Sequence, residues 1–175
     1  MRNKFVIIIV LISVLILSVG VALTTRKTPV QSTRQAQSNS QTLQESTDAR
    51  LEFVGEKFFD WGDIDIYGGI VEKTFTIKNS GTTDLELTNF RTSCMCTEVD
   101  VTIADQKSPS FGMHTPTAWK GIVKPGEEAL VSVKFDPLFH GPEAVGPITR
   151  LVGFNSNDKN NSVGEFRLKA NVIKK

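Results

Sequence analysis

Both cysteines of the 175-residue chain fall in one short segment, RTSCMCTEVD, where a single residue separates Cys94 from Cys96. Residues two apart on a β-strand point to the same face, with Cα atoms about 6.5 to 7 Å apart. A disulfide favours roughly 5.5 to 6 Å, so strand spacing is at the edge of what it accommodates. Three uses stay open: metal or redox chemistry, a disulfide in an oxidising compartment, or packing as small apolar side chains.

The two histidines and one methionine supply further ligands for a metal ion. His114 and His140 lie in segments rich in glycine and proline, and Met113 directly precedes the first of them. Thiolate, thioether and imidazole groups suit Cu(I), and the same set without the thioether suits Zn(II). We therefore predict a soft-metal site, with copper as its ion, built from Cys94, Cys96, His114, His140 and Met113. The alternatives are loop histidines held by hydrogen bonds and a methionine that only packs.

Other functional classes find little support in the sequence. It contains no Gly-rich phosphate loop, no G-x-S-x-G elbow and no H-E-x-x-H motif, so we predict no enzymatic activity. A thiol–disulfide enzyme is disfavoured because C-x-C here lacks the helix N-terminus that lowers a thiol pKa in C-x-x-C enzymes. Residues 51–175 contain 14 Lys and Arg against 17 Asp and Glu, without a basic patch. This balance argues against a nucleic-acid partner.

The segments that must position these side chains are predicted to be strands. VEKTFTIKN, ALVSVKFD and GEFRLKANVIKK alternate apolar and polar residues with period two, and turn sequences such as KPGE separate such segments. This pattern predicts an all-β fold, an immunoglobulin-like antiparallel β-sandwich. We expect its core to contain Phe75, Ile77, Val131, Val133, Phe135, Phe166 and Leu168.

The segment LELTNFRT, directly before the cysteines, is predicted to bend. Leu85 and Leu87 share one face of a strand, but Phe90 breaks the register. This break would let the cysteine pair project at the rim of the sandwich. We expect a long insert, residues 101–120, and the loop that carries His140 to fold over it.

The N-terminal third of the chain is predicted to lie outside the folded domain. The run FVIIIVLISVLILSVGVAL has no charged residue and, at about 1.5 Å per residue in a helix, is long enough to span a bilayer. We predict a transmembrane signal-anchor over residues 1–23, with a cleavable signal peptide as the alternative. The Ser-, Thr- and Gln-rich residues 24–50 are predicted to be a flexible polar linker, and residues 51–175 the folded domain.

Several of these segments together resemble a known family. FFDWGDIDIYGGIVEKTFTIKNSGTTDLELTNFRTSCMCT, IVKPGEEALVSVKFDP, FNSND and LKANV are similar to the bacterial immunoglobulin-like DUF1573 family, which is related to ASH and MSP-type sandwiches. The chain departs from the family pattern at Met95, where glycine is usual, and in the insert. The resemblance implies the fold and export from the cytoplasm, and it implies no established activity.

Two functions are compatible with this sequence. The first is a single-pass, membrane-tethered domain outside the cytoplasm that binds a soft metal, copper, through the cysteine pair. The second is a non-catalytic interaction module that binds another protein of the cell envelope, with structural cysteines. Bound metal and free thiols, measured on the same sample, separate the two.

Overall fold

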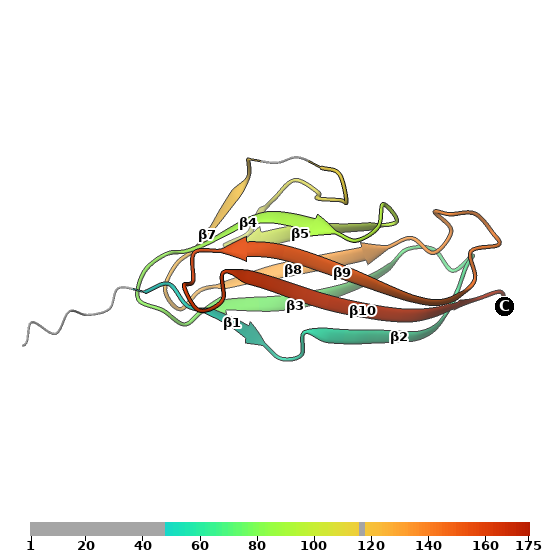
Figure 1. The fold of residues 1–175 in the computed structure, drawn as a ribbon, viewed down its shortest axis with the longest axis horizontal. Helices are drawn as coiled ribbons and strands as arrows, with labels where there is room; N and C mark the ends of the chain where they lie inside the picture. Colours follow the sequence, from blue (N-terminus) through green and yellow to red (C-terminus); the bar gives the residue numbers. More distant parts are fainter. Residues whose placement is uncertain (1–47, 116–117) are drawn as a thin grey trace, which may run out of the picture. The chain divides into compact units, whose positions relative to one another are not determined.

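A computed structural model describes residues 48–115 and 118–175, which belong to one compact unit. These residues form ten strands in two sheets that pack face to face (Figure 1). The all-β sandwich predicted from the alternating segments is therefore confirmed.

The first sheet is antiparallel throughout. Its strands, in spatial order, are β1 (Leu51–Val54), β3 (Val71–Asn79), β8 (Glu128–Phe135), β5 (Thr97–Ile103) and β6 (Gln106–Lys107). Strand β8 shows why these residues form a strand: Ala129, Val131, Val133 and Phe135 are buried, while the residues between them are exposed or half-buried. Burial of one apolar face stabilises the strand against the opposite sheet.

The second sheet departs from the antiparallel prediction. Its strands, in spatial order, are β2 (Phe58–Asp65), β10 (Val163–Ile173), β9 (Gly146–Ser156), β4 (Leu85–Thr92) and β7 (Lys120–Val123). Strands β2 and β10 are parallel, whereas the other pairs are antiparallel. The reason is that the three residues 55–57 carry the chain from β1 in the first sheet into β2 of the second without a reversal (Figure 1).

The predicted core residues are all buried, but they divide between two clusters. Six of the seven belong to the larger cluster between the sheets. Phe135 belongs to a smaller cluster that also contains Cys96 and Ile66. Trp61 packs against both clusters. The buried cysteine is therefore part of an apolar layer that continues the core toward one end of the sandwich.

The predicted insert, residues 101–120, is partly regular structure. Strand β5 continues to Ile103, and a tight turn with positive φ at Ala104 and Asp105 leads into β6. Phe111 is fully buried and exchanges backbone hydrogen bonds of 2.8 and 2.9 Å with Val99. The predicted bounds of the insert were wrong, because Val101 and Ile103 extend the alternation of β5 and bind the segment to the first sheet.

The predicted signal-anchor, residues 1–23, and most of the predicted linker, residues 24–50, lie outside the described residues. Within residues 48–115 and 118–175, no helix has the length and apolar character needed to cross a membrane.

Candidate metal centre

The two cysteines lie in a tight turn that connects β4 in the second sheet to β5 in the first. The amide of Thr97 donates a hydrogen bond of 3.2 Å to the carbonyl oxygen of Cys94. Thr92 Oγ1 lies 2.9 Å from that oxygen and 3.0 Å from the carbonyl oxygen of Thr97, so one hydroxyl holds both sides of the turn. The turn brings the Cα atoms of Cys94 and Cys96 to 5.3 Å.

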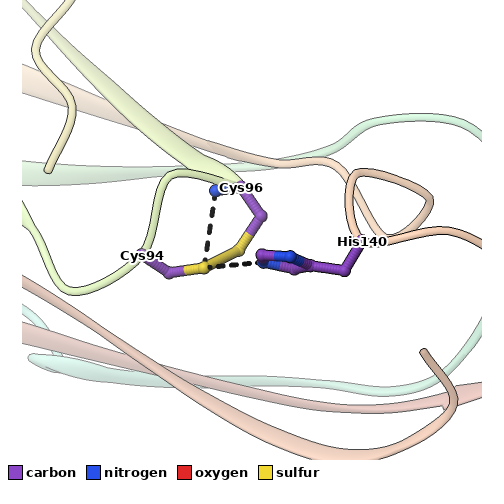
Figure 2. A group of neighbouring side chains, drawn as sticks. All are labelled: Cys94, Cys96 and His140. Atoms are coloured by element: carbon purple, nitrogen blue, oxygen red, sulfur yellow. Dashed lines mark hydrogen bonds between the residues drawn. A yellow bond between two sulfur atoms is a disulfide. The ribbon is translucent and has the colours of Figure 1, made fainter.

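This short separation corrects the expected strand spacing. The register break predicted in LELTNFRT is found at Asn89, which has a φ of 54°, and the pairing of β4 with β9 shifts between Thr88 and Arg91. The strand ends at Thr92, before the first cysteine. Because the cysteines are in a turn, their separation falls within the range that a disulfide accommodates. Cys94 and Cys96 are joined by a disulfide in this structure (Figure 2).

His140 reaches this disulfide from the loop after β8. Its Nε2 lies 3.2 Å from Cys94 Sγ, and Figure 2 shows the ring directed at that sulfur from a separate segment. Antiparallel pairing places the start of β5 beside the end of β8, with Thr97 opposite Phe135. The amide of Asp136 then donates a hydrogen bond of 3.0 Å to the carbonyl oxygen of Cys96. Strand pairing therefore brings together two segments 46 residues apart.

The loop between β8 and His140 is shaped by its own hydrogen bonds. Asp136 Oδ1 accepts a 2.9 Å bond from the amide of Leu138, and the amide of Gly141 donates a 2.8 Å bond to the Leu138 carbonyl oxygen. Gly141 has a φ of +91°, a conformation that glycine adopts without a steric penalty. The loop thus turns back sharply and presents His140 to the cysteines.

Arg150 contacts the other sulfur. Its Nε donates a hydrogen bond of 3.1 Å to Cys96 Sγ, and its Nη1 donates one of 2.9 Å to the carbonyl oxygen of Thr149. The guanidinium carbon lies 5.2 Å from the centre of the Phe135 ring, a cation–π contact. Partial burial lowers the pKa of Arg150 from its usual value, but arginine remains a cation at neutral pH.

Arg150 was not predicted as a site residue. The alternation of β9 could have predicted its position, because Arg150 lies on the same face of the strand as the buried Val152 and Phe154. An arginine on the core-facing side of a strand needs a partner for its charge. Ser93, just before the first cysteine, exchanges hydrogen bonds with Leu151, which fixes this part of β9 beside the turn.

Three of the five predicted ligands come together. One ligand atom from each of Cys94, Cys96 and His140 lies within 4.8 Å of the others. Cys96 is 3% exposed, Cys94 is half-buried and His140 is exposed. The group therefore has one apolar side, toward the core, and one side open to solvent.

The structure does not bring the other two predicted ligands into this group. His114 and Met113 line a different surface pocket together with Met95, Ser110 and Thr115. The Thr115 hydroxyl accepts a 3.1 Å hydrogen bond from the amide of Gly112, which shapes this loop locally. Among the described residues, His114 is therefore not part of the group formed by the two cysteines and His140.

A partly apolar pocket of about 280 Å³ adjoins the disulfide. Its lining includes the exposed apolar side chains of Ile70, Met95 and Phe139 together with Cys96. Phe139 directly precedes His140, and the two rings meet edge to face at 5.1 Å. Cys96 of the disulfide therefore lies in the wall of a partly apolar pocket that is open to solvent.

Comparison with known families supports the resemblance seen in the sequence. The family model described as "Protein of unknown function (DUF1573)" matches residues 51–110. This match includes the cysteine turn and confirms the resemblance to that family over these residues. None of the curated proteins matches the chain.

Solved structures with a similar fold come from several organisms. A protein of unknown function from Porphyromonas gingivalis W83 is 18% identical with a TM-score of 0.53, over 76% of this chain and 51% of that one. The ASH / PapD-like domain 7 of human CEP192 is 15% identical with a TM-score of 0.44, over 74% of this chain and 87% of that one. The chain thus spans about half of the Porphyromonas gingivalis protein, and at 18% identity the likeness to that protein shows the fold alone.

Proposed function

We propose that this protein binds one Cu(I) ion through the thiolates of Cys94 and Cys96 and the imidazole of His140, once the disulfide is reduced. The observation that carries the proposal is the meeting of these three ligand atoms within 4.8 Å, from segments far apart in the sequence. A pair of soft thiolates with one imidazole is a donor set that suits Cu(I).

The charge balance of the site favours Cu(I) over Zn(II). Two thiolates with Cu(I) carry a net charge of −1, which the guanidinium of Arg150 beside Cys96 balances. Two thiolates with Zn(II) are neutral, so the same guanidinium would be left as an uncompensated and partly buried cation. Buried charges are costly unless they are paired. A structural Zn(II) site also has four ligands as a rule, and the described residues bring only three together.

The oxidation state of the cysteines controls this binding. A disulfide has no thiolate to offer a metal ion, so the oxidised form observed here is the form without affinity for copper. Two electrons reduce the pair to a dithiol, and loss of two thiol protons on copper binding gives the ligand set. The protein would therefore hold copper under reducing conditions and release it on oxidation.

We further propose that the domain lies outside the cytoplasm, attached to the membrane by residues 1–23 through the linker 24–50. The support comes from the long apolar run of the sequence. A disulfide between the only two cysteines is compatible with an oxidising compartment. Protease added to spheroplasts should remove the domain, and protection until lysis would contradict the orientation.

The metal proposal is tested by competition between the protein and a chromophoric Cu(I) chelator. The full chain, in mild detergent and without oxygen, is titrated in its reduced and oxidised forms. We expect one Cu(I) per reduced chain and none in the oxidised chain. The double variant Cys94→Ser/Cys96→Ser should bind none in either form. Copper binding that survives in this variant would refute the assignment, and the interaction-module alternative would then take its place.

A further inference from the structure

We propose that the Cys94–Cys96 disulfide exchanges with the thiols of an apolar, cysteine-bearing polypeptide, and that Cys94 is the sulfur attacked. This activity goes beyond copper binding and needs no metal. It also regulates the proposed copper site, because its product is the dithiol.

Access distinguishes the two sulfurs. A thiolate attacks a disulfide along the line of the S–S bond, so the attacked sulfur must be reachable from solvent. Cys94 is half-buried at the margin of the apolar cluster that contains Phe135, whereas Cys96 is 3% exposed and is a buried member of that cluster. Cys94 is therefore the more accessible of the two sulfurs, because Cys96 is almost completely covered even where it borders the pocket.

The leaving group is stabilised where it forms. Attack on Cys94 leaves the electron pair of the broken S–S bond on Cys96 Sγ, which becomes a thiolate. Arg150 Nε already donates a 3.1 Å hydrogen bond to this sulfur, and the guanidinium is held there by Phe135 and the Thr149 carbonyl oxygen. A neutral disulfide sulfur accepts this bond without a net charge, whereas a thiolate adds the attraction between opposite charges. The bond to Arg150 therefore strengthens as Cys96 departs.

The atoms and electrons of the exchange balance when the partner supplies two thiols. The first thiolate of the partner forms a bond to Cys94 Sγ while the Cys94–Cys96 bond breaks. The second thiolate of the partner then attacks the partner's own sulfur in this mixed disulfide, and Cys94 leaves as a thiolate. The partner dithiol is oxidised to a disulfide, the cysteine pair is reduced, and the two protons of the partner's thiols pass to solvent or to the new thiolates.

The pocket beside the disulfide indicates the chemistry of the partner. Ile70 is 64% exposed, and Met95 and Phe139 are also exposed, around a pocket whose wall includes Cys96. Glu98, Lys134 and Asp136 complete its lining, so the apolar side chains form one part of the wall. A polypeptide with its cysteine at Cys94 has to place its neighbouring residues over this pocket. Apolar neighbours gain burial there, which polar neighbours do not. The fitting partner is thus a cysteine in an apolar segment of another protein, rather than a small polar thiol.

The direction of attack is tested by trapping the mixed disulfide. The oxidised full chain reacts with a synthetic peptide that has one cysteine between leucine and phenylalanine residues, with iodoacetamide present to alkylate each thiol as it is released. Mass spectrometry of the digested product should find the peptide on Cys94 and the alkyl group on Cys96. The reverse arrangement would overturn the proposed direction.

The role of Arg150 is tested with the variants Arg150→Gln and Arg150→Lys. Loss of the charged donor should slow reaction with the peptide and with dithiothreitol alike, by about tenfold in Arg150→Gln. Arg150→Lys should recover part of the rate. The control Arg167→Gln removes the same charge from β10, where the side chain pairs with Glu165, and should react at the wild-type rate. An unchanged rate in Arg150→Gln, in a variant that retains the wild-type melting temperature, would overturn this step.

The docking surface is tested with a matched pair of exposed residues. A second peptide has serine and asparagine around the same cysteine, and the apolar peptide should react about tenfold faster than it. Ile70→Ser should reduce this preference without changing the rate with dithiothreitol. Val163→Ser is the control, because Val163 is 62% exposed and lines a different pocket. Equal rates for the two peptides would refute the docking surface.

The proposal of copper binding and the proposal of disulfide exchange can each be refuted independently of the other. Copper titration uses protein reduced chemically, so it does not depend on reaction with any peptide. An exchange-inactive protein that still binds Cu(I) when reduced would refute only the inference of this section.

Discussion

At the scale of single residues, each of the two cysteine sulfurs contacts a nitrogen atom of a different side chain. His140 Nε2 lies 3.2 Å from the half-buried Cys94 sulfur, and Arg150 Nε lies 3.1 Å from the buried Cys96 sulfur. The imidazole is a potential ligand, whereas the guanidinium cannot ligate and acts as a fixed charge. The two contacts therefore make separate, testable contributions.

His140→Ala should weaken Cu(I) binding by about tenfold or more, because it removes one of three ligands. His114→Ala is the control, since His114 lines another pocket, and its affinity should match the wild type. Competition with a Cu(I) chelator measures both variants in the reduced state. If the two histidine variants have equal affinities, the ligand assignment is wrong.

Arg150→Gln should lower the affinity of the reduced protein for Cu(I) by about tenfold and leave its affinity for Zn(II) close to the wild-type value. The reason is that replacing two thiol protons by Cu(I) makes the site negative, which the guanidinium stabilises, whereas replacing them by Zn(II) leaves the charge of the site unchanged. Parallel titrations with the two ions give the ratio of the affinities. A ratio that stays constant in this variant would exclude the proposed charge balance.

The sequence could predict part of this site. The ligand types and the spacing of the cysteines pointed to Cys94, Cys96 and His140. His114 was included as well, because nothing in the local sequence shows that it lines a different pocket. Arg150 was missed because its contact depends on the pairing of β4 with β9, which the sequence does not specify at that position.

At the scale of elements, one buried carboxylate fixes the loop between β9 and β10 to the start of β1. Burial disfavours the charge of Asp158, but donors at Leu51 N (2.9 Å), Asn160 N (2.8 Å) and Asn161 Nδ2 (3.1 Å) outweigh it. The net effect is a pKa below the usual value for aspartate. The side chain of Asp158 thus links the β9–β10 connection to the start of β1.

Asp158→Ala should lower the free energy of unfolding at neutral pH by about 1 to 3 kcal/mol, because three donors lose a charged acceptor. A depressed folded-state pKa stabilises the fold above the unfolded value of about 3.9 and is lost as the pH falls through the folded value. The difference between wild type and variant should therefore shrink below about pH 4.

Urea denaturation at several pH values measures this difference. Asp84→Ala, at an exposed position directly before β4, is the control and should change stability by no more than about 0.5 kcal/mol. A difference that is constant with pH would show that the charge of Asp158 does not contribute.

The strands could be predicted well because their apolar residues alternate strictly, as in β3, β8 and β10. The parallel pairing of β2 with β10 could not be predicted. Alternation shows which face of a strand is buried, but it does not show which other strand is its neighbour. The predicted bounds of the insert were wrong for a similar reason. Local composition marked it as a loop, but Phe111 is buried through a bridge to Val99.

At the scale of the whole molecule, the disulfide adds little to the stability of the fold. The loop that it closes contains only Met95 between the cysteines, and chain entropy assigns such a short loop about 1.5 kcal/mol. The core between the sheets, by contrast, contains 19 buried residues. The fold should therefore persist in the reduced state, which both proposals require.

Reduction of the full chain should lower the free energy of unfolding by no more than about 1.5 kcal/mol. Guanidinium denaturation with and without a phosphine reductant measures this, and Cys94→Ser/Cys96→Ser should match the reduced wild type. Loss of the cooperative transition on reduction would show that the disulfide is structural after all.

The most direct test of the central claim is X-ray absorption at the copper edge of the reduced, Cu(I)-loaded full chain. We predict a first coordination shell of two sulfur atoms and one imidazole nitrogen, from Cys94, Cys96 and His140, with the nitrogen lost in His140→Ala. A shell of nitrogen and oxygen atoms without sulfur, or a shell unchanged in His140→Ala, would contradict the proposed copper site.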